Sequence, residues 1–216
     1  MEECHEGRSA VGHPESDTAF CAGLPTSPRE DIGTVLVTGA SGYIGGRLVP
    51  ELLLRGYRVR AMVRGASGEI ERRWPGAGVV TADALDRRSL GRALDGVDTA
   101  YYLIHSMLLG PGEFAGADAK AARNFADAAA ERGVRRIIYL GGLGDVRSDL
   151  SMHLRSRMEV AERLRAGPVP VTILRAAIII GSGSASYEIL RNLVGRFPVI
   201  MAVSYTHLTL PTNREV

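Results

Sequence analysis

A histidine and an arginine stand four residues apart in the segment SMHLRSRMEV. On a helix, His153 and Arg157 would be neighbours on one face. The histidine could exchange a proton near neutral pH, and the permanent charge of the arginine would favour the neutral imidazole, which can act as a base. The alternative is an ordinary amphipathic helix, with this pair on its polar face and Met152, Val160 and Leu164 towards the core.

A second group of residues suited to chemistry is the turn TGASGYIGG. Gly39, Gly42 and Gly45 follow the spacing G-x-x-G-x-x-G, after a β-branched run and before a helical pattern. In such turns the first glycine permits the tight bend, the second lets a pyrophosphate approach the backbone, and the third lets helix and strand pack closely. The helix N-terminus adds free N–H groups and a positive dipole end. We therefore predict dinucleotide binding here rather than a bare structural turn.

The next β-type run, RVRAMVRG, ends in Arg64 rather than in an acid. An acid at this place would hold a ribose 2′-hydroxyl, whereas an arginine accommodates the 2′-phosphate of NADP. NADP(H) is therefore the favoured cofactor and NAD(H) the second choice, with a solvated surface arginine as the alternative. Further on, the carboxylate of Asp83 could accept a hydrogen bond from the adenine amino group or cap the next turn.

Alternating β-type and helical segments must position these residues. A continuous apolar run is typical of a buried parallel strand, and helices between such strands carry one apolar face. Strands are expected at GVVTA, DTAYYLI, RRIIYLGG and VTILRAAIII. Helices are expected at DRRSLGRAL, with Asp86 as its cap, at EFAGADAKAARNFADAAAERG and at SMHLRSRMEVAERLRAG. The pattern predicts an α/β protein with a Rossmann-type, doubly wound parallel sheet flanked by helices. No repeated period supports a solenoid.

Composition narrows the possible functions. The chain has 216 residues, 45% of them hydrophobic, and a net charge of +2. This length favours one main core, and the near-balanced charge argues against nucleic-acid binding. One of the 26 basic residues is a lysine, Lys120. Cys4 and Cys21 lack the regular ligand spacing of a metal site and are expected to be reduced thiols of a cytoplasmic protein. No run approaches the ~18 apolar residues of a membrane span.

Three regions are expected along the chain. Residues 1–31 mix glycine, proline, serine and acids and are expected to be a disordered leader or sequence upstream of the true start. Residues 32–202 form the nucleotide-binding domain. The final segment, 203–216, resembles translated read-through of a sequencing adapter and is expected to be non-native. We therefore expect a fragment that lacks its C-terminal, substrate-side region.

Several stretches together resemble a known family. VTGASGYIGG, TADAL and RIIYLGGLG are similar to atypical, extended-type short-chain dehydrogenase/reductases, specifically the NmrA-like NAD(P)-binding proteins. YYLIHSM and the stretch from HLRSRMEV to EILRNLV are similar to a bacterial subgroup known only as NAD(P)-binding oxidoreductases of that superfamily. The resemblance runs from about Thr34 to Met201, and the subgroup has no defined substrate.

The resemblance implies further cofactor contacts beside the glycines, Arg64 and Asp83. Tyr43 and Ile44 would lie under the pyrophosphate, and Leu103 and His105 would flank the ribose and nicotinamide side. The alternatives are that Leu103 is core and that His105 is a satisfied strand-end histidine. The full set of added contacts is Ser41, Tyr43, Ile44, Ala84, Leu103 and His105.

Catalysis is the open question. Short-chain dehydrogenases use Tyr-x-x-x-Lys, in which the tyrosine moves the proton and the lysine lowers its pKa and holds the ribose. Aligned on the flanking strands, the tyrosine position holds His153 and the lysine position Arg157, while Gly141 and Gly142 replace the serine region. Lys120 lies on the preceding helix and cannot be the missing partner.

Two functions remain open on these residues. The first is an NADP(H)-dependent oxidoreductase or epimerase-like protein, acting on a small carbonyl or quinone-like molecule, with His153 and Arg157 as catalytic candidates. The second is a non-catalytic, redox-sensing regulator or assembly factor that binds the nucleotide and a protein partner.

Overall fold

A computed structural model of the protein describes residues 29–65, 67–105, 114–143, 152–177, 179–181 and 183–196. Residues 1–28 of the expected leader, which was residues 1–31, and the whole expected tail, residues 203–216, lie outside the described residues. The chain divides into two compact units, one ending at Ala177 and the other beginning at Ile178.

The first unit is built on a six-stranded sheet in the order β3-β2-β1-β4-β5-β6. All five strand pairs are parallel. The strands are β1 (Thr34–Val37), β2 (Val59–Val63), β3 (Gly78–Thr81), β4 (Val97–Tyr102), β5 (Arg136–Gly142) and β6 (Val171–Ala176). This strand order is that of the doubly wound dinucleotide-binding fold. The predicted fold class is therefore confirmed.

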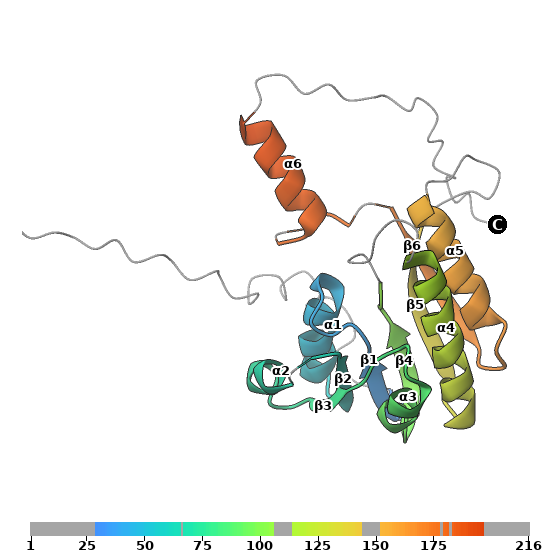
Figure 1. Ribbon diagram of the computed structural model, residues 1–216. Coiled ribbons are helices and arrows are strands. Elements are labelled where there is room, and N and C mark those ends of the chain that lie inside the picture. Colours follow the sequence, from blue (N-terminus) through green and yellow to red (C-terminus); the bar gives the residue numbers. More distant parts are fainter. Residues whose placement is uncertain are drawn as a thin grey trace, which may run out of the picture. The chain divides into compact units, whose positions relative to one another are not determined.

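Helices cover both faces of this sheet (Figure 1). They are α1 (Tyr43–Leu54), α2 (Gly68–Arg73), α3 (Arg87–Ala93), α4 (Phe114–Glu131) and α5 (Met152–Arg165). Side chains of α1 and α2 pack with one set of alternating strand residues, whereas α3, α4 and α5 pack with the other set. This two-sided burial explains why the strands read as continuous apolar runs in the sequence.

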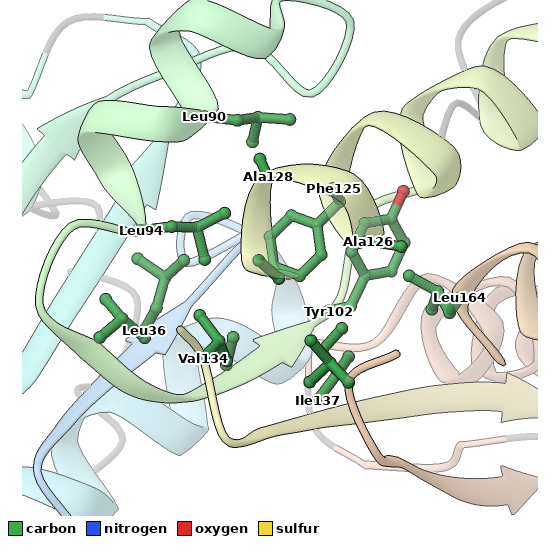
Figure 2. Close-up of a cluster of buried hydrophobic side chains, with 14 of the residues drawn as sticks. Leu36, Leu90, Leu94, Tyr102, Phe125, Ala126, Ala128, Val134, Ile137 and Leu164 are labelled. Carbon is green, nitrogen blue, oxygen red and sulfur yellow. The ribbon is translucent and has the colours of Figure 1, made fainter. Parts of the chain in front are cut away.

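An aromatic cluster lies under α4 and α5. The rings of Tyr102 and Phe125 are 5.0 Å apart between centroids, and those of Tyr102 and Tyr139 are 6.0 Å apart, both edge to face. Figure 2 shows Tyr102 and Phe125 among aliphatic side chains from β1, α3, α4 and α5. Val160 and Leu164, which the sequence assigned to the core face of α5, are 2% and 0% exposed. The cluster fixes α5 on the sheet.

Three elements differ from the sequence-based expectation, and one of them is the helix α6 (Ala185–Arg196) of the second unit, which was not predicted. The six-residue helix α2 was not predicted, and its sequence GEIERR is too short for a helical period to stand out. Strand β6 was expected to reach Ile180 but ends at Ala176. The physical reason is pairing: the last residue of β5, Gly142, is opposite Ala176, so the ladder ends there.

The second unit contains α6 (Ala185–Arg196). Its start is capped by Ser184, whose hydroxyl accepts a hydrogen bond of 3.2 Å from the backbone N–H of Tyr187. Among the residues described in both units, none of the helices combines the length and apolar character needed to cross a bilayer.

Candidate functional site

The strand order reverses between β1 and β4, because the chain runs outward from β1 to β3 and then returns to the other side of β1. In open α/β sheets, ligands bind outside the carboxyl ends of the strands at such a point. Two segments begin there: the glycine turn after β1 and residues 103–105 after β4. The topology thus brings the two predicted halves of the cofactor site together.

The surroundings of each glycine in the turn explain differently why a glycine stands at that position. Gly39 has a φ of +60°, and a Cβ on it would lie 2.8 Å from the carbonyl oxygen of Leu103. A Cβ on Gly45 would lie 2.4 Å from the carbonyl oxygen of Gly39, so α1 could not approach the turn with any side chain here. A Cβ on Gly42 would meet only that same carbonyl oxygen, at 3.2 Å. Gly42 is exposed, which leaves its backbone open to a ligand.

The start of α1 lacks a side-chain cap. Gly42 is the N-cap residue in extended conformation and, as a glycine, has no side chain to accept a hydrogen bond from the first turn. Ser41 is exposed, while Tyr43 and Ile44, the first residues of the helix, are half-buried. A helix N-terminus of this kind presents N–H groups and a positive dipole end to an anion. These residues thus fit a pyrophosphate.

Thr38 joins the two halves of the site, and the sequence analysis missed it. Its buried hydroxyl donates to the carbonyl oxygen of Tyr101 at 3.0 Å and accepts from the N–H of Leu103 at 2.9 Å. Leu103 itself is half-buried against the α1 side of the core. Its side chain packs against the buried cluster and its carbonyl oxygen lies beside Gly39, while its contact with the cofactor stays a prediction. Thr38 and Leu103 are 65 positions apart in the sequence, so a local sequence pattern could not predict their contact.

The predicted adenosine side lies at the ends of β2 and β3. Arg64 follows β2 and is exposed, and the hydroxyl of Thr81 donates to the carbonyl oxygen of Gly65 at 3.4 Å, which ties the two strand ends together. Asp83 accepts a hydrogen bond of 2.9 Å from the N–H of Leu85, so it caps the turn. Its contact with adenine stays a prediction. Ala84 beside it is 4% exposed.

Asn124 on α4 is a second residue that sequence reasoning missed. Its side-chain amide donates to the carbonyl oxygens of Ala84 and Leu85, at 3.2 and 3.1 Å. It lies about forty positions along the chain from the loop it holds. The loop after β3 is therefore fixed to α4, and through the packing of α4 on α5 to the other side of the site.

On the β4 and β5 side, the structure places Arg157 against His105. Arg157 Nη1 lies 3.3 Å from His105 Nε2, across 52 residues. A Cβ on Gly142 would lie 3.1 Å from Arg157 Cδ and 2.9 Å from Leu154 Cδ2. The arginine stem therefore lies on the end of β5, where related enzymes carry a serine. His153 falls on α5, but its side chain lies outside the described residues.

Tyr139 on β5 holds the backbone of the same arginine. Its hydroxyl donates a 3.1 Å hydrogen bond to the backbone carbonyl oxygen of Arg157, and its ring is fully buried. Burial raises the pKa of Tyr139 to about 12, against a smaller lowering by the charge of Arg157. Tyr139 is thus a neutral hydrogen-bond donor over the whole physiological range and holds α5 in place rather than moving protons.

The site can therefore bind and orient a dinucleotide by three groups. They are the open N-terminus of α1, the loop after β3 and the His105–Arg157 pair beyond β4 and β5. Among the described residues, no cluster of three or more histidine, cysteine, aspartate or glutamate side chains could hold a metal.

Several relatives of this chain are reductases. A ceramide reductase of Caulobacter vibrioides is 30% identical over 175 residues, which cover 81% of this chain and 55% of that protein. Cinnamoyl-CoA reductase 1 of Oryza sativa subsp. japonica is 34% identical over 119 residues, or 52% of this chain and 35% of that protein. The chain spans about a third to about half the length of these relatives.

Solved structures share the fold. A short-chain dehydrogenase/reductase superfamily protein from Agrobacterium tumefaciens with bound NAD has a TM-score of 0.56 and 22% identity, covering 66% of this chain and 48% of that one. The triphenylmethane reductase of Citrobacter sp. complexed with NADP(H) has a TM-score of 0.57 and 25% identity, covering 67% and 50%. The model of the NmrA-like family matches residues 31–193. On this match, which covers most of the chain and includes every strand, the protein belongs to the NmrA-like family.

Proposed function

We propose that the protein binds a nicotinamide dinucleotide across the carboxyl ends of β1 and β4, and that it prefers NADP(H) to NAD(H). The observation that carries the proposal is the geometry of the glycine turn. Gly39 and Gly45 leave no room for a side chain, whereas Gly42 is exposed at the start of α1 and a Cβ on it would meet the carbonyl oxygen of Gly39 at 3.2 Å. Such a surface fits a pyrophosphate. The NADP-bound and NAD-bound relatives support this choice of ligand.

Arg64 carries the proposed preference for NADP(H). It is exposed directly after β2, where a carboxylate would accept from a ribose 2′-hydroxyl and a guanidinium would donate to a 2′-phosphate. The carboxylate of Asp83 or the neighbouring backbone would form hydrogen bonds with the adenine. NAD(H) remains the second ligand of the proposal.

We propose an oxidoreductase of the atypical short-chain type, acting in the cytoplasm on a small carbonyl or quinone-like substrate. A bound nicotinamide would supply the hydride. Arg157 would hold the nicotinamide side of the ligand by donating hydrogen bonds to ribose oxygens, and His153 is the candidate for handling the proton. Positioning would supply much of the rate, because the tyrosine, lysine and serine of related enzymes are absent here.

A non-catalytic role is the second candidate, and one observation favours it. Gly142 stands where the serine is expected, and a Cβ there would lie 2.9 Å from Leu154 Cδ2 and 3.1 Å from Arg157 Cδ. A chain without this serine could bind the nucleotide as a redox sensor and pass its state to a protein partner.

The test separates binding from turnover. The protein is titrated with NADPH and with NADH by fluorescence, and NADPH oxidation is then followed by absorbance with a panel of quinones and aldehydes. We expect micromolar NADPH binding, weaker NADH binding and measurable oxidation with some member of the panel. Binding without turnover would favour the sensor role, whereas no binding of either nucleotide would refute the proposal. A His153→Ala variant that binds NADPH but loses turnover would assign catalysis to His153.

A further inference from the structure

We infer that His105 is a positioning residue that orients the guanidinium of Arg157 towards the nicotinamide-side half of the dinucleotide. The inference rests on the proposed function. It goes further, because it gives His105 a task that depends on its ring nitrogen rather than on proton transfer to a substrate.

The first step is the contact itself. Arg157 Nη1 and His105 Nε2 are 3.3 Å apart. A guanidinium has only N–H donors and does not lose a proton in proteins, so in this contact the imidazole nitrogen must be the acceptor. The proton of the neutral ring then resides on Nδ1, which fixes the tautomer.

The second step is the rigidity of the arginine. Its backbone carbonyl oxygen receives the hydrogen bond of the buried Tyr139, and its stem lies against Gly142 at the end of β5. Backbone and stem are therefore set by α5 and β5, while the head contacts His105 in the segment that follows β4. The position of this guanidinium is thus determined by three segments of the chain, and the contact from His105 acts directly on its charged end.

The third step is the choice of partner. A carboxylate in the place of His105 would bind the guanidinium more strongly and would also cancel its charge. A neutral imidazole orients the guanidinium and leaves its charge intact. A guanidinium carries five N–H donors in a planar fork, a geometry suited to binding ribose or phosphate oxygens, and the contact with His105 is made at Nη1.

The fourth step is location. His105 comes two residues after Leu103, whose carbonyl oxygen touches the glycine turn at Gly39. Arg64, in contrast, follows β2, on the far side of β1 from β4. His105 and Arg157 therefore serve the nicotinamide half, whereas Arg64 serves the adenosine half, and the two contributions can be measured apart.

The experiment uses NADPH and adenosine 2′,5′-bisphosphate as probes of the whole ligand and of its adenosine half. Dissociation constants are measured calorimetrically for the wild type and for His105→Leu, Arg157→Met and the double variant. Losing a hydrogen bond to a charged donor should weaken NADPH binding about tenfold in each single variant. The double variant should bind NADPH no more weakly than either single variant, because each change already removes the same His105–Arg157 interaction. Binding of the bisphosphate should stay unchanged throughout.

Two matched variants test whether weakened NADPH binding could come from a disturbed structure instead of the lost contact. His105→Gln places an amide oxygen where Nε2 stood and should keep NADPH binding within about threefold of the wild type. Arg165→Met removes an exposed arginine from the same helix and should have no effect. Thermal unfolding of every variant reports whether it is folded.

A spectroscopic readout is independent of activity and of ligand. Nitrogen-15 NMR of the ligand-free protein should show the Nδ1–H tautomer for His105, assigned by its absence in His105→Gln, and a shift of that tautomer balance in Arg157→Met. An Nε2–H tautomer, additive losses in the double variant, or NADPH binding unaffected by His105→Leu would each overturn the inference while leaving the proposed function intact. Failure of the wild type to bind NADPH would instead refute the proposed function and remove the ligand of this inference.

Discussion

The hydroxyl of Tyr139 on β5 donates a hydrogen bond of 3.1 Å to the backbone carbonyl oxygen of Arg157 on α5. This contact joins a strand to the helix that carries the candidate arginine. Burial of the tyrosine also makes the free energy of unfolding depend on pH in the alkaline range, because it raises the pKa of Tyr139 from about 10 in the unfolded chain to about 12 in the fold.

The sign of this dependence follows from proton binding. Between these two pKa values the folded state holds the proton and the unfolded state loses it, so the free energy of unfolding falls as pH rises. We expect the wild type to exceed Tyr139→Phe in stability by about 1 kcal/mol below pH 9, from the hydrogen bond. Urea unfolding at intervals up to about pH 11 should show that advantage shrink and then reverse. A constant difference across the range would contradict the assignment.

Gly45→Ala should prevent normal closure of the turn on α1. The added Cβ would lie 2.4 Å from the carbonyl oxygen of Gly39 and 2.7 Å from Ala40 Cα, both of them backbone atoms. We expect a loss of about 3 kcal/mol or more in the free energy of unfolding and no detectable NADPH binding. Gly46→Ala is the matched control, since its Cβ would meet its nearest neighbour at 3.8 Å. That variant should bind normally and gain up to about 1 kcal/mol from helix propensity.

Arg64→Ser should change the choice of cofactor more than the affinity for dinucleotides in general. Without the guanidinium, the Kd for NADPH should rise about tenfold, while the Kd for NADH stays within about twofold. Arg58→Ser, at the opposite end of β2 and equally exposed, should alter neither value. Equal losses for both nucleotides in Arg64→Ser would show that the arginine does not read the 2′-phosphate.

Asn124→Ala should loosen the loop after β3. The change removes both hydrogen bonds to the carbonyl oxygens of Ala84 and Leu85, so we expect a loss of about 1 to 2 kcal/mol in stability. Binding of adenosine 2′,5′-bisphosphate should weaken as well, because the loop carries the proposed adenine contacts. Arg123→Ala, an exposed neighbour on α4, serves as control. An unchanged bisphosphate affinity would show that the loop keeps its shape without the amide.

Local pattern predicted the fold because each element has a local cause. Asp86 was expected to cap the third helix, and its carboxylate does accept a hydrogen bond from the N–H of Arg88. The glycine turn was recognisable because its spacing and its flanking strand and helix lie within one short segment. The short helix α2 lacked enough residues to show a period.

The contacts that complete the site could not be predicted from local sequence patterns. Thr38 meets Leu103, Asn124 meets Ala84, and Arg157 meets His105, all from residues forty or more positions apart. The sequence placed Arg157 and His105 as separate candidates with separate alternatives. Their partnership depends on the register between β4, β5 and α5, which only a three-dimensional arrangement supplies.

Gly142 bears on any effort to engineer this chain into a conventional dehydrogenase. Installing tyrosine and lysine on α5 would not be enough, because a serine at 142 would require both Leu154 and Arg157 to give way. A shift of Arg157 would also act on its contact with His105. These neighbouring positions are therefore expected to be coupled, and a library that varies them together suits the task better than single substitutions.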